Sequence, residues 1–512
     1  MKHVTLVPVL LCALLICPAR MCGETGDSVT VIDLEGTVNR IDTFDIDRDG
    51  KHEVVVQTGA ELVAMSLADT SAGSKPKVVG RTVLKPDVFL YDVVDLTGKG
   101  RCEILAVTSE SAIVLPFISP GSAPEEGSAV LAKLESPPFT GTLSKGAVPI
   151  RSRLAADIDG DGIPELILPH CDGWRIFRRD SDDKYTAGGV LSVRPASVMS
   201  VGWGLHGEIY CRSTLPTLFD GDFNGDRRRD FAAISAGQLL VFAQGAGGSF
   251  ASEPSQEIAL SPLKSTADAE KAGWIFGPAA APFVSDLTGD GLDDIVIVFP
   301  YDGSVAVHIG REDATFNATP DHLLRVDGWI ARAWLHCPAR DTASANTAQV
   351  STLLIGVSPK LGFWTGVQVA ADKQVAVRLE SHAIGKGVAF SDVAWQRSIL
   401  VGVEMSVVHW IKEIKLAAAV GVDADFDGDA ISDLLVKSAA DEFELFKGNG
   451  NGGYSEEPVR RLPTGALKGM VFSKENRPHI ADLDGDGRAE AVLLATEPRK
   501  NRSALCVVRF GE

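Results

Sequence analysis

Short acidic loops hold the residues of this chain whose types and spacing could do chemistry. Six nine-residue strings begin at Asp45, Asp157, Asp222, Asp286, Asp425 and Asp482, and each ends on a carboxylate. Oxygen-bearing side chains recur at loop positions 1, 3, 5 and 9, and glycine is usual at position 6. Several hard oxygens around one point suit calcium, and glycine permits the sharp turn.

The predicted ligands are the side chains at positions 1, 3, 5 and 9 and the backbone carbonyl at position 7. They are Asp45, Asp47, Asp49, Lys51, Glu53, Asp157, Asp159, Asp161, Ile163, Glu165, Asp222, Asn224, Asp226, Arg228, Asp230, Asp286, Thr288, Asp290, Leu292, Asp294, Asp425, Asp427, Asp429, Ile431, Asp433, Asp482, Asp484, Asp486, Arg488 and Glu490. The pattern therefore predicts about six Ca²⁺ sites.

The alternative is that these Asp-Gly-rich strings are solvated turns, which is the better interpretation of any single copy. Six copies favour a metal, because the 22 carboxylates at their ligand positions would otherwise repel one another. An EF-hand is excluded, since its last acid comes at position 12 and helices flank it. Here the last acid comes at position 9, between apolar runs that resemble strands.

Three loops depart from the pattern. In the seventh copy, which starts at Asp95, Lys99 takes a ligand position, and we expect its ammonium group to pair with Asp95 and Glu103 in place of a metal. Arg227 and Ala430 replace the glycine at position 6 of two other loops, so those two sites are predicted to be weaker.

The elements that must position these loops are strands in a repeating unit. Successive loops start 50, 62, 65, 64, 139 and 57 residues apart, and two strand-like runs follow each loop. Such a step fits a four-stranded β-meander, the blade of a propeller. The long gap contains Ser351–Val357, a strand-like run without an acidic loop, which predicts a metal-free blade. Val388–Ile411 is irregular and leaves the count at seven or eight blades.

A blade has exposed edges and needs neighbours, so the ring must close. The run Val29–Ile32 near the start could complete the blade that ends with Ala504–Phe510. We therefore predict one all-β propeller domain over residues 24–512.

The loops resemble the FG-GAP/VCBS repeats, which also occur in integrin α-subunit propellers. Asp222-Phe-Asn-Gly-Asp226 and Asp482-Leu-Asp-Gly-Asp-Gly487 carry the resemblance. It covers essentially the whole mature chain and implies a calcium-stabilised propeller used in extracellular adhesion or recognition. The Phe-Gly and Gly-Ala-Pro signatures of the family are poorly kept, so the chain looks like the generic bacterial form rather than an integrin subunit.

Residues 1–23 read as a signal peptide, with Lys2, an apolar run from Val4 to Cys17, and small residues near Ala19. We expect a secreted, periplasmic or cell-surface protein without a membrane span. The net charge of −19 excludes nucleic acid as a partner. We expect a monomer.

Binding is favoured over catalysis, because the sequence shows no known catalytic motif. His170 beside Cys171 and His336 beside Cys337 are taken as structural, and a Cys171–Cys211 bridge stays open. The predicted partner is an extracellular protein or glycan. The alternative is a calcium-dependent polysaccharide lyase, which would need a base and cations that neutralise an acidic sugar.

Overall fold

The computed structural model describes the greater part of residues 27–511. The described residues are 27–68, 75–98, 100–120, 129–135, 137, 143, 147–180, 184–193, 196–201, 209–246, 248–260, 282–300, 302–337, 351–359, 374–385, 389–404, 415–416, 421–437, 442–464, 467, 470–472, 478–497 and 502–511. The predicted signal peptide and Lys99 lie outside them. Within this part of the chain, no helix is long and apolar enough to cross a membrane.

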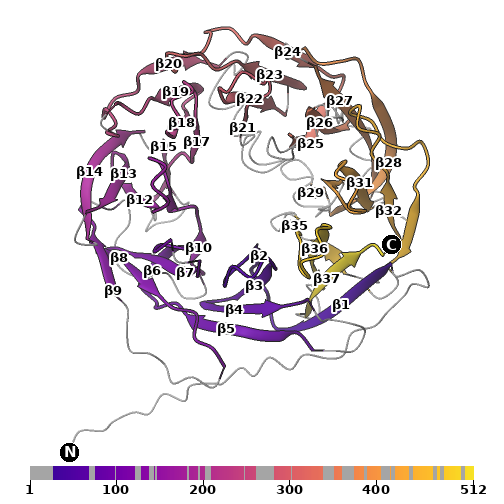
Figure 1. Ribbon diagram of the computed structural model, residues 1–512, viewed down its shortest axis with the longest axis horizontal. Helices are drawn as coiled ribbons and strands as arrows, with labels where there is room; N and C mark the ends of the chain where they lie inside the picture. Colours follow the sequence, from indigo (N-terminus) through magenta and orange to yellow (C-terminus); the bar gives the residue numbers. More distant parts are fainter. Residues whose placement is uncertain are drawn as a thin grey trace, which may run out of the picture.

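Eight sheets stand side by side in a ring around a common axis (Figure 1). The strands of each blade are given from the inside outward. Blade 1 consists of β2 (Arg40–Phe44), β3 (Glu53–Thr58), β4 (Glu61–Ser66) and β5 (Lys77–Val83), and blade 2 of β6 (Val88–Val94), β7 (Glu103–Thr108), β8 (Ser111–Leu115) and β9 (Ala129–Lys133). Blade 3 consists of β11 (Ala155–Ala156), β12 (Glu165–His170), β13 (Gly173–Arg179) and β14 (Tyr185–Ser192), and blade 4 of β17 (Leu218–Gly221), β18 (Asp230–Ser235), β19 (Gln238–Phe242) and β20 (Gln256–Ala259).

The second half of the chain repeats this meander. Blade 5 consists of β21 (Phe283–Ser285), β22 (Asp294–Phe299), β23 (Ser304–His308) and β24 (His322–Arg325), and blade 6 of β25 (Trp329–His336), β26 (Ser351–Ser358), β27 (Gln374–Ile384) and β28 (Trp395–Glu404). Blade 7 consists of β30 (Val422–Ala424), β31 (Asp433–Lys437), β32 (Glu442–Phe446) and β33 (Arg460–Pro463), and blade 8 of β35 (His479–Ala481), β36 (Glu490–Glu497), β37 (Arg502–Arg509) and β1 (Ser28–Glu35). The count is therefore eight.

Short additional strands extend several blades. β10 (Ile150–Arg151) pairs in parallel with β6, β29 (Lys415–Leu416) pairs with β28, and β34 (Val471–Phe472) pairs with β36. A separate hairpin, β15 (Ala196–Val201) with β16 (Ile209–Thr214), lies between blades 3 and 4 in the sequence. The repeat pattern did not predict this hairpin.

The core of the ring lies between blades rather than within them. Val54 and Val56 of β3, for example, share a buried cluster with Leu494 and Leu505 of blade 8. Each blade buries both faces against its neighbours, so its second strand is apolar at nearly every residue, as in Asp294–Phe299, which is buried throughout. A single blade could not exclude water from these faces, and the ring is the unit of stability.

The two ends of the described chain close the ring, as the sequence predicts. β1 pairs antiparallel with β37 from Ser28 opposite Arg509 to Glu35 opposite Arg502. Figure 1 shows the indigo β1 beside the yellow β37. Blade 8 thus takes its outermost strand from the start of the chain, which protects the last sheet edge.

The blade predicted in the long gap is present, and that it binds no metal stays a prediction. β26 contains the run Ser351–Val357, and blade 6 passes from β25 to β26 through residues 337–350, which contain no acidic string of the repeated type. The irregular stretch from Val388 to Ile411 supplies β28, the outer strand of the same blade, and not an additional blade.

Candidate metal centres

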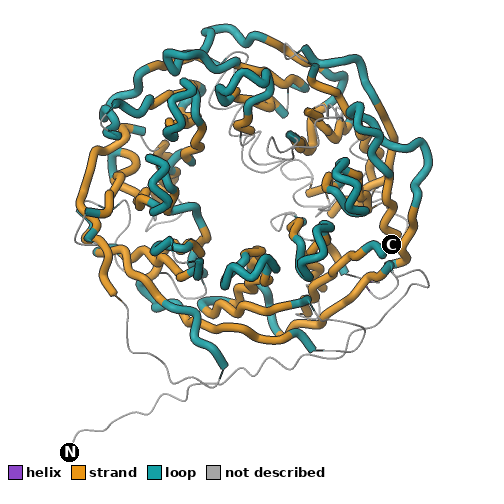
Figure 2. Tube along the Cα trace, viewed as in Figure 1, coloured by secondary structure: helices purple, strands orange, loops and turns teal. Residues whose placement is uncertain are grey.

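Each acidic loop connects the innermost strand of a blade to the second strand. The position-9 acid is in every case the first residue of that second strand: Glu53, Glu103, Glu165, Asp230, Asp294, Asp433 and Glu490. Figure 2 shows loops in teal that recur near the inner edge of successive blades. The sheet therefore fixes the direction of the last acid, while the rest of the loop folds back over it.

The aspartate at position 1 organises the loop by accepting two backbone hydrogen bonds. In the Asp482 loop, Gly485 N–H donates to Oδ1 at 2.6 Å and Gly487 N–H donates to Oδ2 at 2.9 Å. The Asp157, Asp222, Asp286 and Asp425 loops repeat both bonds. In the Asp45 loop the first bond comes from Asp49 instead.

Positions 3 and 5 continue the same ladder. Asp484 Oδ1 accepts the N–H of Asp486 at 3.2 Å, and Asp486 Oδ1 accepts the N–H of Arg488 at 2.8 Å. The position-7 residues, Lys51, Ile163, Arg228, Leu292, Ile431 and Arg488, all donate their N–H to the position-5 carboxylate in this way. That their carbonyls bind a metal stays a prediction.

The acid at position 9 is buried beneath the loop. Glu53, Glu165, Asp230, Asp294, Asp433 and Glu490 are all at most 5% exposed, and one oxygen of each accepts the N–H of position 2. Burial raises the pKa of Glu53, Glu165, Asp433 and Glu490 to about 7, and that of Asp230 and Asp294 to about 6. A nearby cation would favour their ionised form.

Four loops bring three carboxylates together, with oxygens of positions 1, 3 and 9 all within 4.8 Å of one another. These groups are Asp45, Asp47 and Glu53; Asp157, Asp159 and Glu165; Asp425, Asp427 and Asp433; and Asp482, Asp484 and Glu490. The position-5 aspartates do not join these groups. The Asp222 and Asp286 loops form no such triad, since Asn224 and Thr288 replace the acid at position 3.

The left-handed backbone conformation occurs at two positions of each loop, not one. Position 6 has a positive φ in every loop, including Arg227 and Ala430, both at 65°. Position 4 also has a positive φ, and it is glycine in every loop except the first, where Arg48 has φ 61°. From the sequence, a sharp turn is predicted at position 6 only. The glycine that recurs at position 4 could have predicted the second left-handed residue.

A lysine from the same blade reaches into the Asp425 loop. Lys447 follows β32, and its Nζ contacts Asp427 Oδ2 and lies 2.9 Å from Asp429 Oδ2. These carboxylates raise the pKa of Lys447, so it stays protonated. Related contacts join Arg228 to Asp226, and Arg178 Nη1 to Asp159 Oδ2 at 3.8 Å. The loop pattern did not predict the contacts of Lys447 and Arg178, because these two residues lie outside the loops that they contact.

The Asp95 loop has the same fold as the others. Gly100 N–H donates to Asp95 Oδ2 at 2.6 Å, and Leu96 N–H donates to Glu103 Oε2 at 3.2 Å. Its lysine lies outside the described residues, so pairing of Lys99 with Asp95 and Glu103 stays a prediction.

Neighbouring loops are hydrogen-bonded to one another around the ring. The N–H of position 8 donates to a carbonyl at position 1 or 2 of the preceding loop, and the donors are His52, Cys102, Arg229, Asp293 and Ala489, at 2.7–3.0 Å. The Asp157 loop has Pro164 at position 8, which lacks an N–H, and there Arg179 Nη1 donates to Leu96 O at 3.2 Å.

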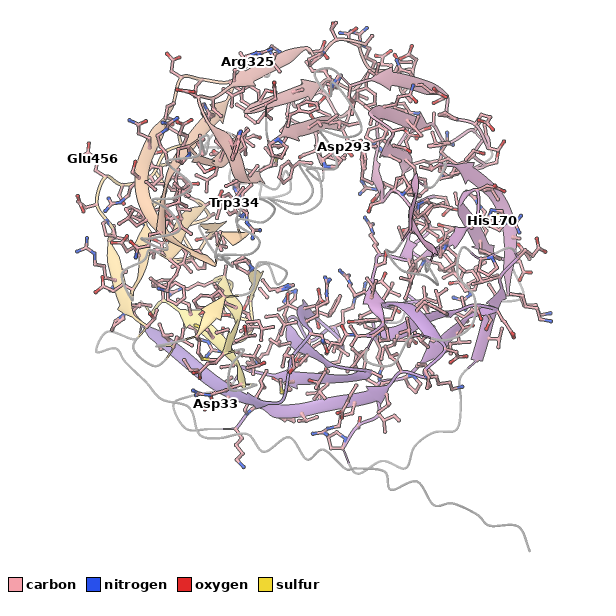
Figure 3. All side chains as sticks on the ribbon, turned by 180° about the vertical axis from the view of Figure 1, so that it is seen from behind. Asp33, His170, Asp293, Arg325, Trp334 and Glu456 are labelled. Atoms are coloured by element: carbon pink, nitrogen blue, oxygen red, sulfur yellow. The ribbon has the colours of Figure 1, made fainter. Side chains whose placement is uncertain are left out.

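Arginine and aspartate side chains on the inner strands and on the loops next to them form ion pairs near the centre of the ring. Arg40 Nε lies 2.5 Å from Asp42 Oδ2, Arg151 Nη2 lies 3.2 Å from Asp92 Oδ1, and Arg153 contacts Asp220. Arg229 Nη1 lies 3.6 Å from Asp293 Oδ2, and Figure 3 shows Asp293 at the inner edge. Each of these four guanidinium groups thus faces a carboxylate.

The donor chemistry of the loops fits calcium. The side chains supply carboxylate, amide and hydroxyl oxygens, the donors this ion prefers. Four loops gather three carboxylates around one point, and burial raises the pKa of the position-9 acid in each of them. Several loops are therefore compatible with Ca²⁺ sites.

In comparison with known proteins, one stretch of the chain matches a family of repeats. Residues 425–493, which include two of the acidic loops, match the FG-GAP-like repeat. No curated protein matches the chain at a significant level.

Similar solved structures include a lectin of Agrocybe aegerita described as recognising non-reducing terminal N-acetylglucosamine, at 15% identity over 88% of this chain and 90% of that one, with a TM-score of 0.40. The Vibrio cholerae biofilm matrix protein Bap1 has 11% identity over 97% and 91%, with a TM-score of 0.39. The Vanderwaltozyma polyspora Nup133 β-propeller has 8% identity over 96% and 100%, with a TM-score of 0.40. Similarity this low does not bear on what the chain binds.

Proposed function

The chain carries an FG-GAP-like repeat in an eight-bladed β-propeller, and on this premise we propose that it is an exported calcium-binding module that recognises a protein or glycan. The observation that carries the proposal is the set of carboxylate triads at the heads of the second strands. Calcium would hold each loop over its buried acid and keep the ring rigid enough to present a binding surface.

Calcium would be held by the side chains at loop positions 1, 3, 5 and 9, with the position-7 carbonyl as a further donor. The strongest sites should be the Asp45, Asp157 and Asp482 loops, where a glutamate lies at position 9 and all three triad residues are acidic. Their longer side chain places one oxygen on the position-2 N–H. In Asp230, Asp294 and Asp433 both oxygens already accept a backbone N–H.

A structural role for calcium also accords with export, which the apolar segment at the start of the sequence predicts. Extracellular calcium levels can saturate sites of modest affinity. Secretion into the medium, the periplasm or onto a cell surface is therefore part of the proposal.

Binding is favoured over the polysaccharide-lyase alternative by the ion pairs at the centre of the ring. A lyase needs cations that neutralise the carboxylate of an acidic sugar. The four arginines in question, Arg40, Arg151, Arg153 and Arg229, each face an aspartate of the chain itself. Incubation with acidic polysaccharides tests the alternative, and release of unsaturated ends would establish lyase activity.

Thermal unfolding with and without calcium tests the calcium part of the proposal. Ligand that binds only the folded chain stabilises it by about 2.7 kcal/mol per site at one hundred times its Kd. We expect a calcium-dependent rise in Tm that EDTA abolishes, with several equivalents bound in isothermal titration. An unchanged Tm in excess EDTA would exclude structural calcium.

The recognition part is tested separately with the calcium-loaded protein. Binding to an array of glycans and extracellular-matrix proteins should be retained in calcium and lost in EDTA. A triad variant, Asp482→Asn with Asp484→Asn, removes one site and serves as a control for direct contact between ligand and metal. If it lowers Tm but leaves affinity unchanged, calcium acts through the fold.

A further inference from the structure

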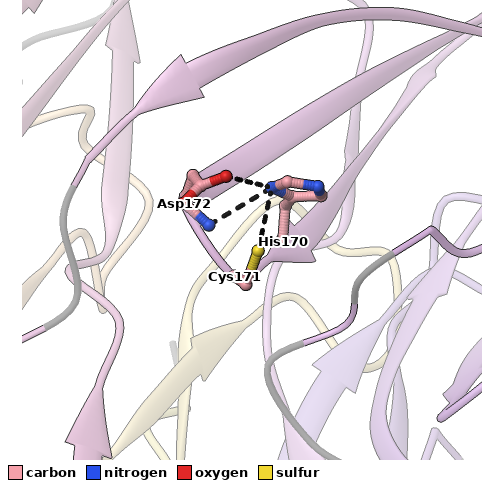
Figure 4. A group of neighbouring side chains, drawn as sticks. All are labelled: His170, Cys171 and Asp172. Atoms are coloured by element: carbon pink, nitrogen blue, oxygen red, sulfur yellow. Dashed lines mark hydrogen bonds and ion pairs between the residues drawn. The ribbon is translucent and has the colours of Figure 1, made fainter.

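The turn between β12 and β13 carries three metal-ligating side chains on consecutive residues, His170, Cys171 and Asp172 (Figure 4). β12 begins at Glu165, directly after its acidic loop, and ends at His170. The turn therefore lies at the opposite end of the strand, on the other face of the ring from the candidate calcium loops. His170 is 9% exposed, while Cys171 and Asp172 are exposed.

Two of the three distances between these side chains are close to those around one tetrahedral ion. His170 Nδ1 lies 3.8 Å from Cys171 Sγ and 3.7 Å from Asp172 Oδ2, and the three donor atoms lie within 4.8 Å of one another. Zinc bonds to sulfur, nitrogen and oxygen at tetrahedral angles place sulfur and nitrogen about 3.6 Å apart, and nitrogen and oxygen about 3.4 Å apart. The sulfur–nitrogen and nitrogen–oxygen pairs are within a few tenths of an ångström of these values, and the sulfur and oxygen atoms lie within 4.8 Å of one another.

The imidazole is already oriented for this task. The backbone N–H of Asp172 donates to Nδ1 at 3.2 Å, so the lone pair of Nδ1 faces the turn. A metal bound at Nδ1 would use this lone pair and so replace the hydrogen bond from Asp172. Burial of the ring against the blade holds it in place.

The hairpin itself does not require these residues. The corresponding two-residue turns of other blades contain Gly59 and Ala60, Ser109 and Glu110, or Ala236 and Gly237. None of these pairs includes histidine or cysteine. Cys171 is a free thiol in the structure, so the Cys171–Cys211 bridge is not formed there; the side chain of Cys211 lies outside the described part.

We propose that His170, Cys171 and Asp172 bind one borderline transition-metal ion of the Zn²⁺ type. Thiolate and imidazole are poor ligands for calcium and good ones for zinc, cobalt or copper. Binding forms a sulfur–metal bond and releases the proton of the Cys171 thiol to water. The fourth position stays open to water or to a donor from a partner, so this face of the ring carries a metal centre independent of the acidic loops.

Cobalt(II) added to the full chain in excess calcium tests the site, because a cobalt–thiolate bond gives a charge-transfer band that oxygen ligands do not. We expect about one equivalent of cobalt, displaced by zinc. Cys171→Ser should abolish the band, and His170→Gln should weaken cobalt binding at least about tenfold. Cys102→Ser, which changes a thiol beside an acidic loop, should leave the band unchanged.

Alkylation of Cys171 gives a second readout that does not depend on a spectrum. We expect a maleimide to label this exposed thiol in the metal-free protein and zinc to slow the labelling, while calcium has no effect. An equal cobalt band in Cys171→Ser, labelling that zinc does not change, or no labelling at all would overturn the proposal.

Discussion

At the scale of single residues, the acidic loops differ from one another more than their shared pattern indicates. The Asp425 loop has a complete carboxylate triad, yet Lys447 Nζ lies against two of its carboxylates. An ammonium group tethered there supplies part of the charge that calcium would bring. Arg509 Nε lies 3.8 Å from Glu490 Oε1 of the Asp482 triad, whereas the described part of the chain shows no ion pair between a lysine or arginine and the Asp45 triad. Loops that share the same acidic pattern therefore need not have equal affinity.

Replacing Lys447 with methionine should therefore strengthen calcium binding by the Asp425 loop. The metal-free variant should be less stable, because Asp427 and Asp429 lose their counter-charge, and calcium should restore more than it does in the parent protein. Calcium titration by calorimetry measures the change. Arg461→Met, which removes a cation on β33 that pairs with Glu444, is the matched control and should leave calcium binding as it is.

Backbone strain at position 6 gives a second prediction. Ala430 has φ 65°, in the left-handed region that costs an L-residue roughly 1–2 kcal/mol. Ala430→Gly should stabilise the protein by about 0.5–1 kcal/mol after the entropy cost of glycine. The reverse change at the same loop position, Gly487→Ala, should cost a similar amount, since a Cβ there meets no atom within 4 Å. Denaturant melts of both variants measure the change in the free energy of unfolding. Stability equal to that of the parent protein in both variants would exclude backbone strain at position 6.

At the scale of elements, the strand that closes the ring matters most. β1 comes from the start of the chain but forms the outer edge of blade 8 through eight residue pairs with β37. Its side chains Ile32 and Leu34 are buried in the cluster between blades 8 and 1. Closure therefore depends on side-chain packing across two interfaces as well as on the ladder of backbone bonds.

Truncating this packing should destabilise the whole ring. Ile32 is 1% exposed, and Ile32→Ala should cost about 2–5 kcal/mol. Val83→Ala, on the outer strand of blade 1 and 68% exposed, should change stability by less than about 0.5 kcal/mol. Thermal melts in calcium compare the two. A small effect of Ile32→Ala would mean that the ring holds together without the closing strand.

At the scale of the whole molecule, the loops form a hydrogen-bonded chain around most of the ring. Position-8 donors connect the Asp425, Asp482, Asp45 and Asp95 loops in order, and likewise the Asp157, Asp222 and Asp286 loops. The series of position-8 bonds is interrupted at Pro164 of the Asp157 loop and at blade 6, which has no acidic loop between the Asp286 and Asp425 loops. The six buried position-9 acids beneath these loops all have a raised pKa, because burial disfavours their ionised form.

The raised pKa values of these acids predict how the stability of the metal-free protein depends on pH. The pKa of Glu53, Glu165, Asp433 and Glu490 is raised to about 7 in the fold, above its value in the unfolded chain. A raised pKa stabilises the fold below the unfolded value and loses that contribution as pH rises through the folded value. In EDTA, Tm should therefore fall by several degrees between about pH 5 and pH 8.

Calcium should reverse the direction of that trend. The metal favours the ionised acids, so the rise in Tm that calcium produces should grow as pH increases through about 6 to 7. Paired melts with EDTA and with calcium at each pH isolate this difference from other titrating groups. A calcium effect that is constant from pH 5 to pH 8 would contradict a role for the buried position-9 acids.

The sequence by itself determined the repeat, the β-meander, the ring closure by the first strand and the blade in the long gap, because each follows from local periodicity and from edges that must be covered. It also placed the acids that form the four triads, since their spacing is set within a single loop. Only the tertiary structure decided the blade number, the contact of Lys447 with the Asp425 loop and the bonds between successive loops. Those depend on which residues distant in sequence are brought together, and no local pattern encodes that distance.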